Sequence, residues 1–257
     1  MPASGPLGHP RFLERHRPSA LAVSCNLPLF FSGVTRLVDA AHVAGVPALA
    51  GGRALQSGPQ HAHVLGADGW APDADGSIVL LRSWQHEPPS SSTAPTRSSV
   101  AALELDLRAR ELASAAFDDL AERLPAMAGY DARQLTRALE DLAYIVQFVA
   151  AAQLVDDPSV LREFLAWLVE LLGARGVPKN AVVAGLGSLS PLLDQGTCLP
   201  HCGRACRGSQ YLMVLLGEQW AISRTGREVL GRAHGNGRRG TRWRRHRAGQ
   251  RCEGRSL

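Results

Sequence analysis

The chain has 257 residues, of which 45% are hydrophobic and 20% are charged, and this composition is typical of a globular protein with a sizeable core. No apolar run approaches the ~20 residues needed to span a bilayer, so we exclude a membrane-spanning protein. The N-terminal stretch lacks an apolar signal core, and we therefore expect a cytoplasmic protein. The net charge of +5 is uneven, because residues 201–257 carry thirteen arginines against three glutamates and the first two hundred residues are therefore acidic.

Residues 19–52 contain the first clear structural pattern. The apolar run at residues 20–23 is typical of a central strand of a parallel sheet. A second short strand is predicted at residues 48–50, ending on Gly51 and Gly52. The helical spacing between the two strands is set by Val34, Leu37, Val38 and Ala41. The result is a strand–helix–strand unit, and the loops that follow its strands are where open α/β sheets bind ligands.

The pattern continues on both sides of this unit. Residues 11–17 predict the end of a helix before the first strand, and residues 53–65 predict a short helix after the second. A third strand is expected at residues 69–71, followed by a helix that Asp73 or Asp75 would cap. For residues 1–85 we therefore predict an α/β domain, a partial doubly wound parallel sheet that forms the back half of a Rossmann-like domain.

Residues 86–99 are rich in Pro, Ser and Thr and predict a linker, and residues 100–195 predict an α-helical bundle. One helix is expected up to Pro125, a second capped by Asp131, a third begun by Asp157 and Pro158, and a weaker fourth over residues 180–193. The third is apolar nearly all round and should be the most buried. The first helix would place these residues on one face: Leu105, Leu112, Ala116, Leu120 and Leu124.

Residues 196–257 are Arg-rich and predict a disordered basic tail, either a genuine extension or the product of a shifted reading frame. Within the tail, Cys198, His201, Cys202 and Cys206 have a spacing that zinc or an iron–sulfur cluster accepts, although one tight loop rarely supplies all four ligands. Residues 242–247 (RWRRHR) suit nucleic acid, but a solvated tail is the simpler interpretation, and we expect neither a metal site nor nucleic-acid binding.

Three segments, FLERHRPSALAVSCNLPL, VTRLVDAAHVAGVPALAGGRAL and LGADGWAPDADGSIVLL, together resemble the cobalamin-binding domain family. The likeness is closer to the actinobacterial corrinoid-binding regulatory proteins, in which a helical region follows the cobalamin domain. The resemblance implies that Ser24 faces the dimethylbenzimidazole of the cofactor's nucleotide tail. It also implies that Gly51 and Gly52 let the backbone lie close to the tail, with Asn26 and Leu27 lining its entry.

The chain departs from this family before Ser24. The family's D-x-H-x-x-G loop, which supplies the histidine that ligates cobalt, does not occur there, because His9 lacks the flanking residues and His16 falls in the predicted helix. The resemblance thus implies an N-terminally truncated member that binds cobalamin weakly or has lost it.

No nucleophile elbow or phosphate-cradling loop occurs, and we predict no catalysis. The expected function is therefore a non-catalytic, regulatory cobalamin-binding-domain protein whose bundle contacts a protein partner. The alternative is a helical protein-interaction module in which the α/β domain is vestigial.

Overall fold

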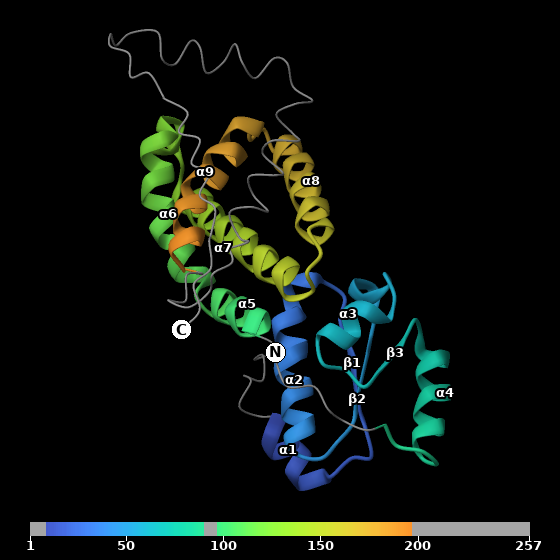
Figure 1. The fold of residues 1–257 in the computed structure, drawn as a ribbon. Coiled ribbons are helices and arrows are strands. Elements are labelled where there is room, and N and C mark those ends of the chain that lie inside the picture. The colour runs from blue at the N-terminus through green and yellow to red at the C-terminus, as the bar shows by residue number, and fades with distance from the viewer. Residues whose placement is uncertain (1–8, 90–96, 197–257) are drawn as a thin grey trace, which may run out of the picture. The chain divides into compact units, whose positions relative to one another are not determined.

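The computed structural model describes residues 9–89 and 97–196 (Figure 1). The first part alternates helices and strands and the second is helical. The first part contains α1 (His9–His16), β1 (Leu21–Ser24), η1 (Pro28–Phe30), α2 (Phe31–Val43), β2 (Ala48–Gly51), η2 (Arg53–Leu55), α3 (Pro59–Val64), β3 (Gly69–Ala71) and α4 (Ala74–Trp84). The second contains α5 (Arg97–Leu107), α6 (Ala109–Arg123), η3 (Pro125–Gly129), α7 (Ala132–Leu154), α8 (Ser159–Ala174) and α9 (Lys179–Gly196).

The three strands form one parallel sheet in the order β1-β2-β3. Two short crossovers connect them, α2 between β1 and β2 and α3 between β2 and β3. The structure confirms a mixed α/β protein in which a small parallel sheet is followed by helices. The three predicted strands are all present, and Asp73 caps α4 by accepting a hydrogen bond from the backbone N–H of Gly76 at 2.8 Å.

The prediction that the first strand is central was wrong. In the sheet that the described residues form, β1 lies at an edge and β2 is the central strand. The exposed fraction alternates along β1, with Ala22 and Ser24 exposed and Leu21 and Val23 half-buried, whereas residues 48–50 of β2 are all buried. Alanine is compatible with a buried or an exposed position, so an apolar run that contains alanine does not show whether both faces of the strand are covered.

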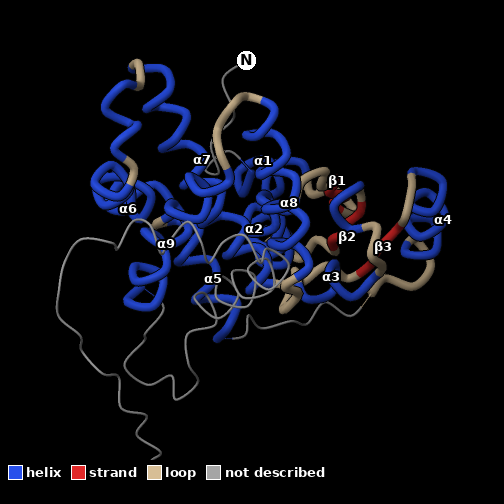
Figure 2. Tube along the Cα trace, turned by 90° about the horizontal axis from the view of Figure 1, so that it is seen from above, coloured by secondary structure: helices blue, strands red, loops and turns tan. Residues whose placement is uncertain are grey.

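The two faces of the sheet are covered differently. Residues paired in register on parallel strands point to the same side, so Val23, Ala50 and Trp70 share one face and Leu49 and Gly69 share the other. The first face packs into the main core together with α2 and α3. The second is covered at β3 by α4, where a Cβ on Gly69 would lie 2.7 Å from a Leu80 methyl carbon. Figures 1 and 2 show α2 and α4 on opposite sides of the sheet.

The second part of the chain is a bundle of helices in which α7 is the central element. It packs against α5, α6, α8 and α9, and its capping box joins Asp131 and Gln134 as the sequence predicted at Asp131. The expectation that the third helix, α8, would be the most buried was wrong, because Trp167 on α8 is 55% exposed whereas nine residues of α7 are buried.

The sheet and the bundle belong to one compact unit and share one hydrophobic core. Helix α7 packs on α2 and η1. Two side-chain pairs add to this contact: Arg36 of α2 lies 3.3 Å from Asp106 of α5, and His61 of α3 lies 3.2 Å from Asp157, just before α8. A change in the helices therefore has a direct physical route to the loops around β1.

Three further boundaries differ from the sequence prediction. Residues 53–65 form η2 and α3 instead of one helix, with Gly58 and Pro59 at the break. The single helix expected before Pro125 is divided at Arg108 into α5 and α6. Helix α5 begins at Arg97, inside the stretch predicted as a linker.

The predicted tail from residue 197 onward lies outside the described residues, and so do the cysteine–histidine group at residues 198–206 and the arginine run at residues 242–247. Among the helices that the structure does describe, none combines the length and the apolar character needed to cross a bilayer.

Candidate functional site

Two of the predicted site residues, Ser24 and Gly51, are neighbours at the carboxyl end of the sheet. They are the last residues of β1 and β2 and form a register pair. Both belong to the face that α4 covers at β3, but on β1 this face is open, as the exposed side chains of Ala22 and Ser24 show. The hydroxyl of Ser24 thus stands on an open surface beside glycine backbone.

Gly52 has a role in the fold itself. Its φ of +99° lies in the region that favours glycine, and a Cβ there would meet the carbonyl oxygen of Cys25 at 2.6 Å and the hydroxyl of Ser24 at 2.9 Å. The loop after β2 is fastened to the loop after β1, because Ala54 N–H donates to the Cys25 carbonyl at 3.0 Å and Cys25 N–H donates to the Gly51 carbonyl at 2.8 Å. The packing of these loops requires glycine at position 52 whether or not a ligand binds.

Asn26 and Leu27 follow in the loop between β1 and η1. Asn26 is exposed and Leu27 is 49% exposed, so both side chains are accessible to solvent. Between them and the strand, Cys25 is buried and its thiol donates to the Leu27 carbonyl at 3.3 Å. Burial raises the pKa of the Cys25 thiol, although this hydrogen bond partly opposes the rise. Cys25 is consequently a packing residue and not a reactive thiolate.

Three histidines near the sheet lie outside the loops that follow its strands. His16 ends α1 ahead of the amino end of β1, at the opposite end of the strand from Ser24. His42 pairs with Asp68 at 2.9 Å, and His61 is buried against Asp157. None of these three histidines belongs to the loops that follow the strands, and within the described ranges no three His, Cys, Asp or Glu side chains are grouped as a metal site would require.

The sequence matches no model of a protein family and no curated protein. The chemistry available at this edge therefore follows from its own residues: an exposed hydroxyl at Ser24, an amide at Asn26 and a half-exposed Leu27 beside glycine backbone. These three side chains offer hydrogen bonds and one apolar contact, and none of them is charged.

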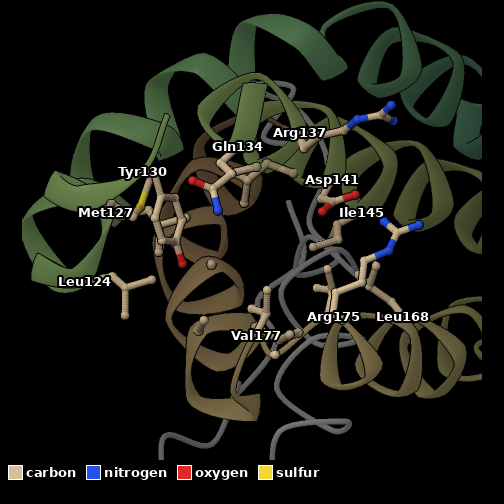
Figure 3. A pocket seen from close by; sticks show the side chains of 18 of the residues that line it. Leu124, Met127, Tyr130, Gln134, Arg137, Asp141, Ile145, Leu168, Arg175 and Val177 are labelled. Carbon is tan, nitrogen blue, oxygen red and sulfur yellow. The ribbon is translucent and has the colours of Figure 1, made fainter. Parts of the chain in front are cut away.

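Sequence reasoning missed a cavity of about 530 Å³ in the bundle, which α6, η3, α7, α8 and α9 enclose together (Figure 3). Polar residues of α7, among them Arg137 and Asp141, line it beside the apolar Leu142 and Ile145. The sequence signal for this cavity was one face of α7, on which charged and apolar residues follow one another at helical spacing. It was not enough, because the opposite wall comes from α8 and α9, more than twenty residues further along the chain.

Proposed function

We propose that the chain is a non-catalytic protein of regulatory type whose sheet edge receives the nucleotide tail of a corrinoid and whose helices pass on the occupancy of that edge. The observation that carries the proposal is the register of β1 and β2, which makes Ser24 and Gly51 neighbours on a face that is open at β1. The resemblance of about residues 11–84 to cobalamin-binding domains supplies the identity of the ligand.

Binding should be weak, because the loops that follow the strands offer contacts to the tail and no histidine for the cobalt. The ligand would depend on stacking and hydrogen bonding by Ser24, Asn26 and Leu27. The packing of η1 on α7 gives these loops a direct contact with the bundle, since η1 begins one residue after Leu27. A shift of η1 on ligand binding would thus change its packing on α7.

The test is a titration of the full chain with hydroxocobalamin, followed by visible absorbance. Insertion of the tail removes its base from cobalt and changes the spectrum, so a saturable change is the expected result. Cobinamide, which has the corrin ring without the tail, should not bind. The variant Ser24→Leu should abolish the change, whereas Ser19→Leu, which alters an exposed serine before the amino end of β1, should leave it intact.

Two results would reject the proposal: equal binding of cobinamide and cobalamin, or no binding at millimolar cobalamin. The first would mean that the tail makes no difference. The second would leave the alternative function, a helical interaction module with a structural α/β part. One observation favours that alternative: the close approach of Gly51 to the Ala71 carbonyl and of Gly52 to Cys25 explains the glycine doublet without a ligand.

A further inference from the structure

The floor of the cavity in the bundle is apolar. Its volume of about 530 Å³ is in the range of pockets that hold small organic ligands, about 300–1,000 Å³. The floor residues come from every wall and are buried at their positions. They include Leu120, Met127, Leu142, Ile145, Leu168 and Val182. Because this surface carries no hydrogen-bonding side chain, it favours an apolar body on the part of the ligand that reaches it.

The small residues that line the cavity include Ala138 on α7 and Gly185 on α9. A Cβ on Gly185 would come within 3.3 Å of a Leu142 methyl carbon and 4.0 Å of one on Leu120, so the glycine keeps α9 close without filling the opening. Larger side chains at these two positions would occupy the space that a ligand needs.

The mouth of the cavity is polar and mainly cationic. Arg133, Arg137 and Arg175 line it, against one lining carboxylate, Asp141. Arg137 lies 3.4 Å from Glu140 in an exposed pair, whereas Arg133 and Arg175 have no ion-pair partner among the residues that the structure describes. With Asp141 as the one carboxylate that lines the cavity, these arginines leave a net positive charge beside an apolar chamber, which is complementary to an anionic head group.

Neutral hydrogen-bonding groups stand beside these charges. Figure 3 shows the side chains of Tyr130 and Gln134 directed into the opening. The amide oxygen of Gln134 is engaged by the backbone N–H of Asp131 at 2.9 Å, which leaves its amide nitrogen as a donor. The phenol hydroxyl and this amide can donate hydrogen bonds to the same acceptor oxygens that the arginines attract.

Asp141 lies beside Arg175 in Figure 3 and is half-buried. Burial raises its pKa above the ordinary value, and the positive charges of Arg175 and Arg137 only partly offset that rise. The ionised carboxylate therefore costs the folded chain free energy. Its charge attracts the guanidinium of Arg175 to this side of the mouth.

We propose that this cavity binds a medium-chain acyl carboxylate, with the chain in the apolar chamber and the carboxylate at the mouth that bears Arg133 and Arg175. The acidic balance of the first two hundred residues makes a local excess of arginine at one opening a specific feature and not a general property of the surface. This site shares no residue with the sheet edge around Ser24, so either site can fail its test without the other.

The test uses the full chain and isothermal titration calorimetry with three probes of equal chain length: dodecanoate and dodecyltrimethylammonium, each below its micellar concentration, and dodecanol, below its solubility limit. Dodecanoate should bind with a stoichiometry near one. Dodecanol should bind at least about tenfold more weakly, because it fills the chamber but forms no charge-assisted contacts at the mouth. The cationic probe should show no saturable binding.

Variants then assign the binding to the cavity. Arg175→Gln should weaken dodecanoate binding about tenfold and leave dodecanol unchanged. Ala138→Phe should abolish binding of both, because it fills the chamber. Arg110→Gln is the matched control, an exposed arginine on α6 that does not line the cavity, and should change nothing. Circular dichroism of each variant checks the fold. If Ala138→Phe does not fold, Arg175→Gln still tests the mouth of the cavity, because Arg175 is exposed and follows α8.

Equal affinities for dodecanoate and dodecanol would overturn the proposal, and so would dodecanoate binding that survives both Arg175→Gln and Ala138→Phe. No detectable dodecanoate binding to the full chain would overturn it as well.

Discussion

Asp157 should stabilise the protein through two separate contacts. One of its oxygens accepts the backbone N–H of Ser159 at 2.9 Å at the start of α8, and the other lies 3.2 Å from Nε2 of His61 on α3. Loss of a helix cap costs about 1 kcal/mol. An ion pair that is partly open to solvent contributes about 0–1 kcal/mol, and the Asp157 side chain is 32% exposed. We therefore expect Asp157→Ala to lower the free energy of unfolding by about 1–2 kcal/mol at pH 7.

Asp157→Asn separates the two contacts, since its amide oxygen can still cap α8 whereas its charge is gone. It should cost less than Asp157→Ala, about 1 kcal/mol or below. Although burial alone would raise the pKa of Asp157, its hydrogen bonds with Ser159 and the charge of His61 lower the pKa below the ordinary aspartate value. The unfolded chain thus binds the proton more readily, and the stabilisation is present above about pH 4 and is lost as the pH falls below it.

The assay is urea denaturation of both variants at a series of pH values from 7 to 3. Asp118→Asn on α6 serves as the control, because it removes the same charge from an exposed helix position. The deficit of Asp157→Asn relative to the parent chain should shrink as the pH falls toward 3. An unchanged deficit across the range, or equal deficits for the Asn and Ala variants at pH 7, would refute the separation into a cap and a charge contact.

Four other substitutions test the fold and the cavity mouth. Gly52→Ala should lower the free energy of unfolding by about 2 kcal/mol or more, because of its φ of +99° and the nearby Cys25 carbonyl. Gly33→Ala on α2, where a Cβ would meet nothing within 4 Å, should instead raise it by about 0.5–1 kcal/mol. Thermal or urea unfolding measures both changes. Asp131→Ala should cost about 1 kcal/mol through the capping box of α7, and a loss below a few tenths of that would contradict the cap. Asp141→Asn should stabilise the chain at pH 7, because burial raises the pKa of this carboxyl and the variant removes its charge. The gain in stability should vanish below about pH 4, where the carboxyl is protonated in both the folded and the unfolded chain. A gain that persists there would exclude the charge as its cause.

The sequence predicted the elements whose signals are local. Asp73 and Asp131 mark helix starts through their own side chains, and residues 69–71 form a strand where a turn precedes a short apolar run. The order of the strands was harder, because the apolar residues of β1 and β2 are equally compatible with a central or an edge position. Likewise Trp167 counts as apolar in a periodic pattern, but only the packing of α8 against its neighbours determines that it is half-exposed.

At the candidate sites, too, the sequence predicted what depends on local patterns and not what depends on tertiary packing. The pairing of Ser24 with Gly51 follows from the parallel sheet that the sequence already predicted. The contact between Gly52 and Cys25 could not be foreseen, since it depends on the path of two loops. The cavity depends on side chains such as Arg133 and Arg175, which lie about forty residues apart on separate elements, and no local pattern joins them.

Helix α7 has a mechanical consequence. Its 23 residues extend about 35 Å at the usual rise per residue, and along that length it lines the cavity and also packs on α2 and η1. Close packing transmits strain between neighbouring elements, so a displaced helix displaces what it packs against. A displacement of α7 at Arg133 or Gln134 would therefore also shift its contact with η1, which begins one residue after Leu27, and any ligands at the two proposed sites would influence each other through the position of one helix.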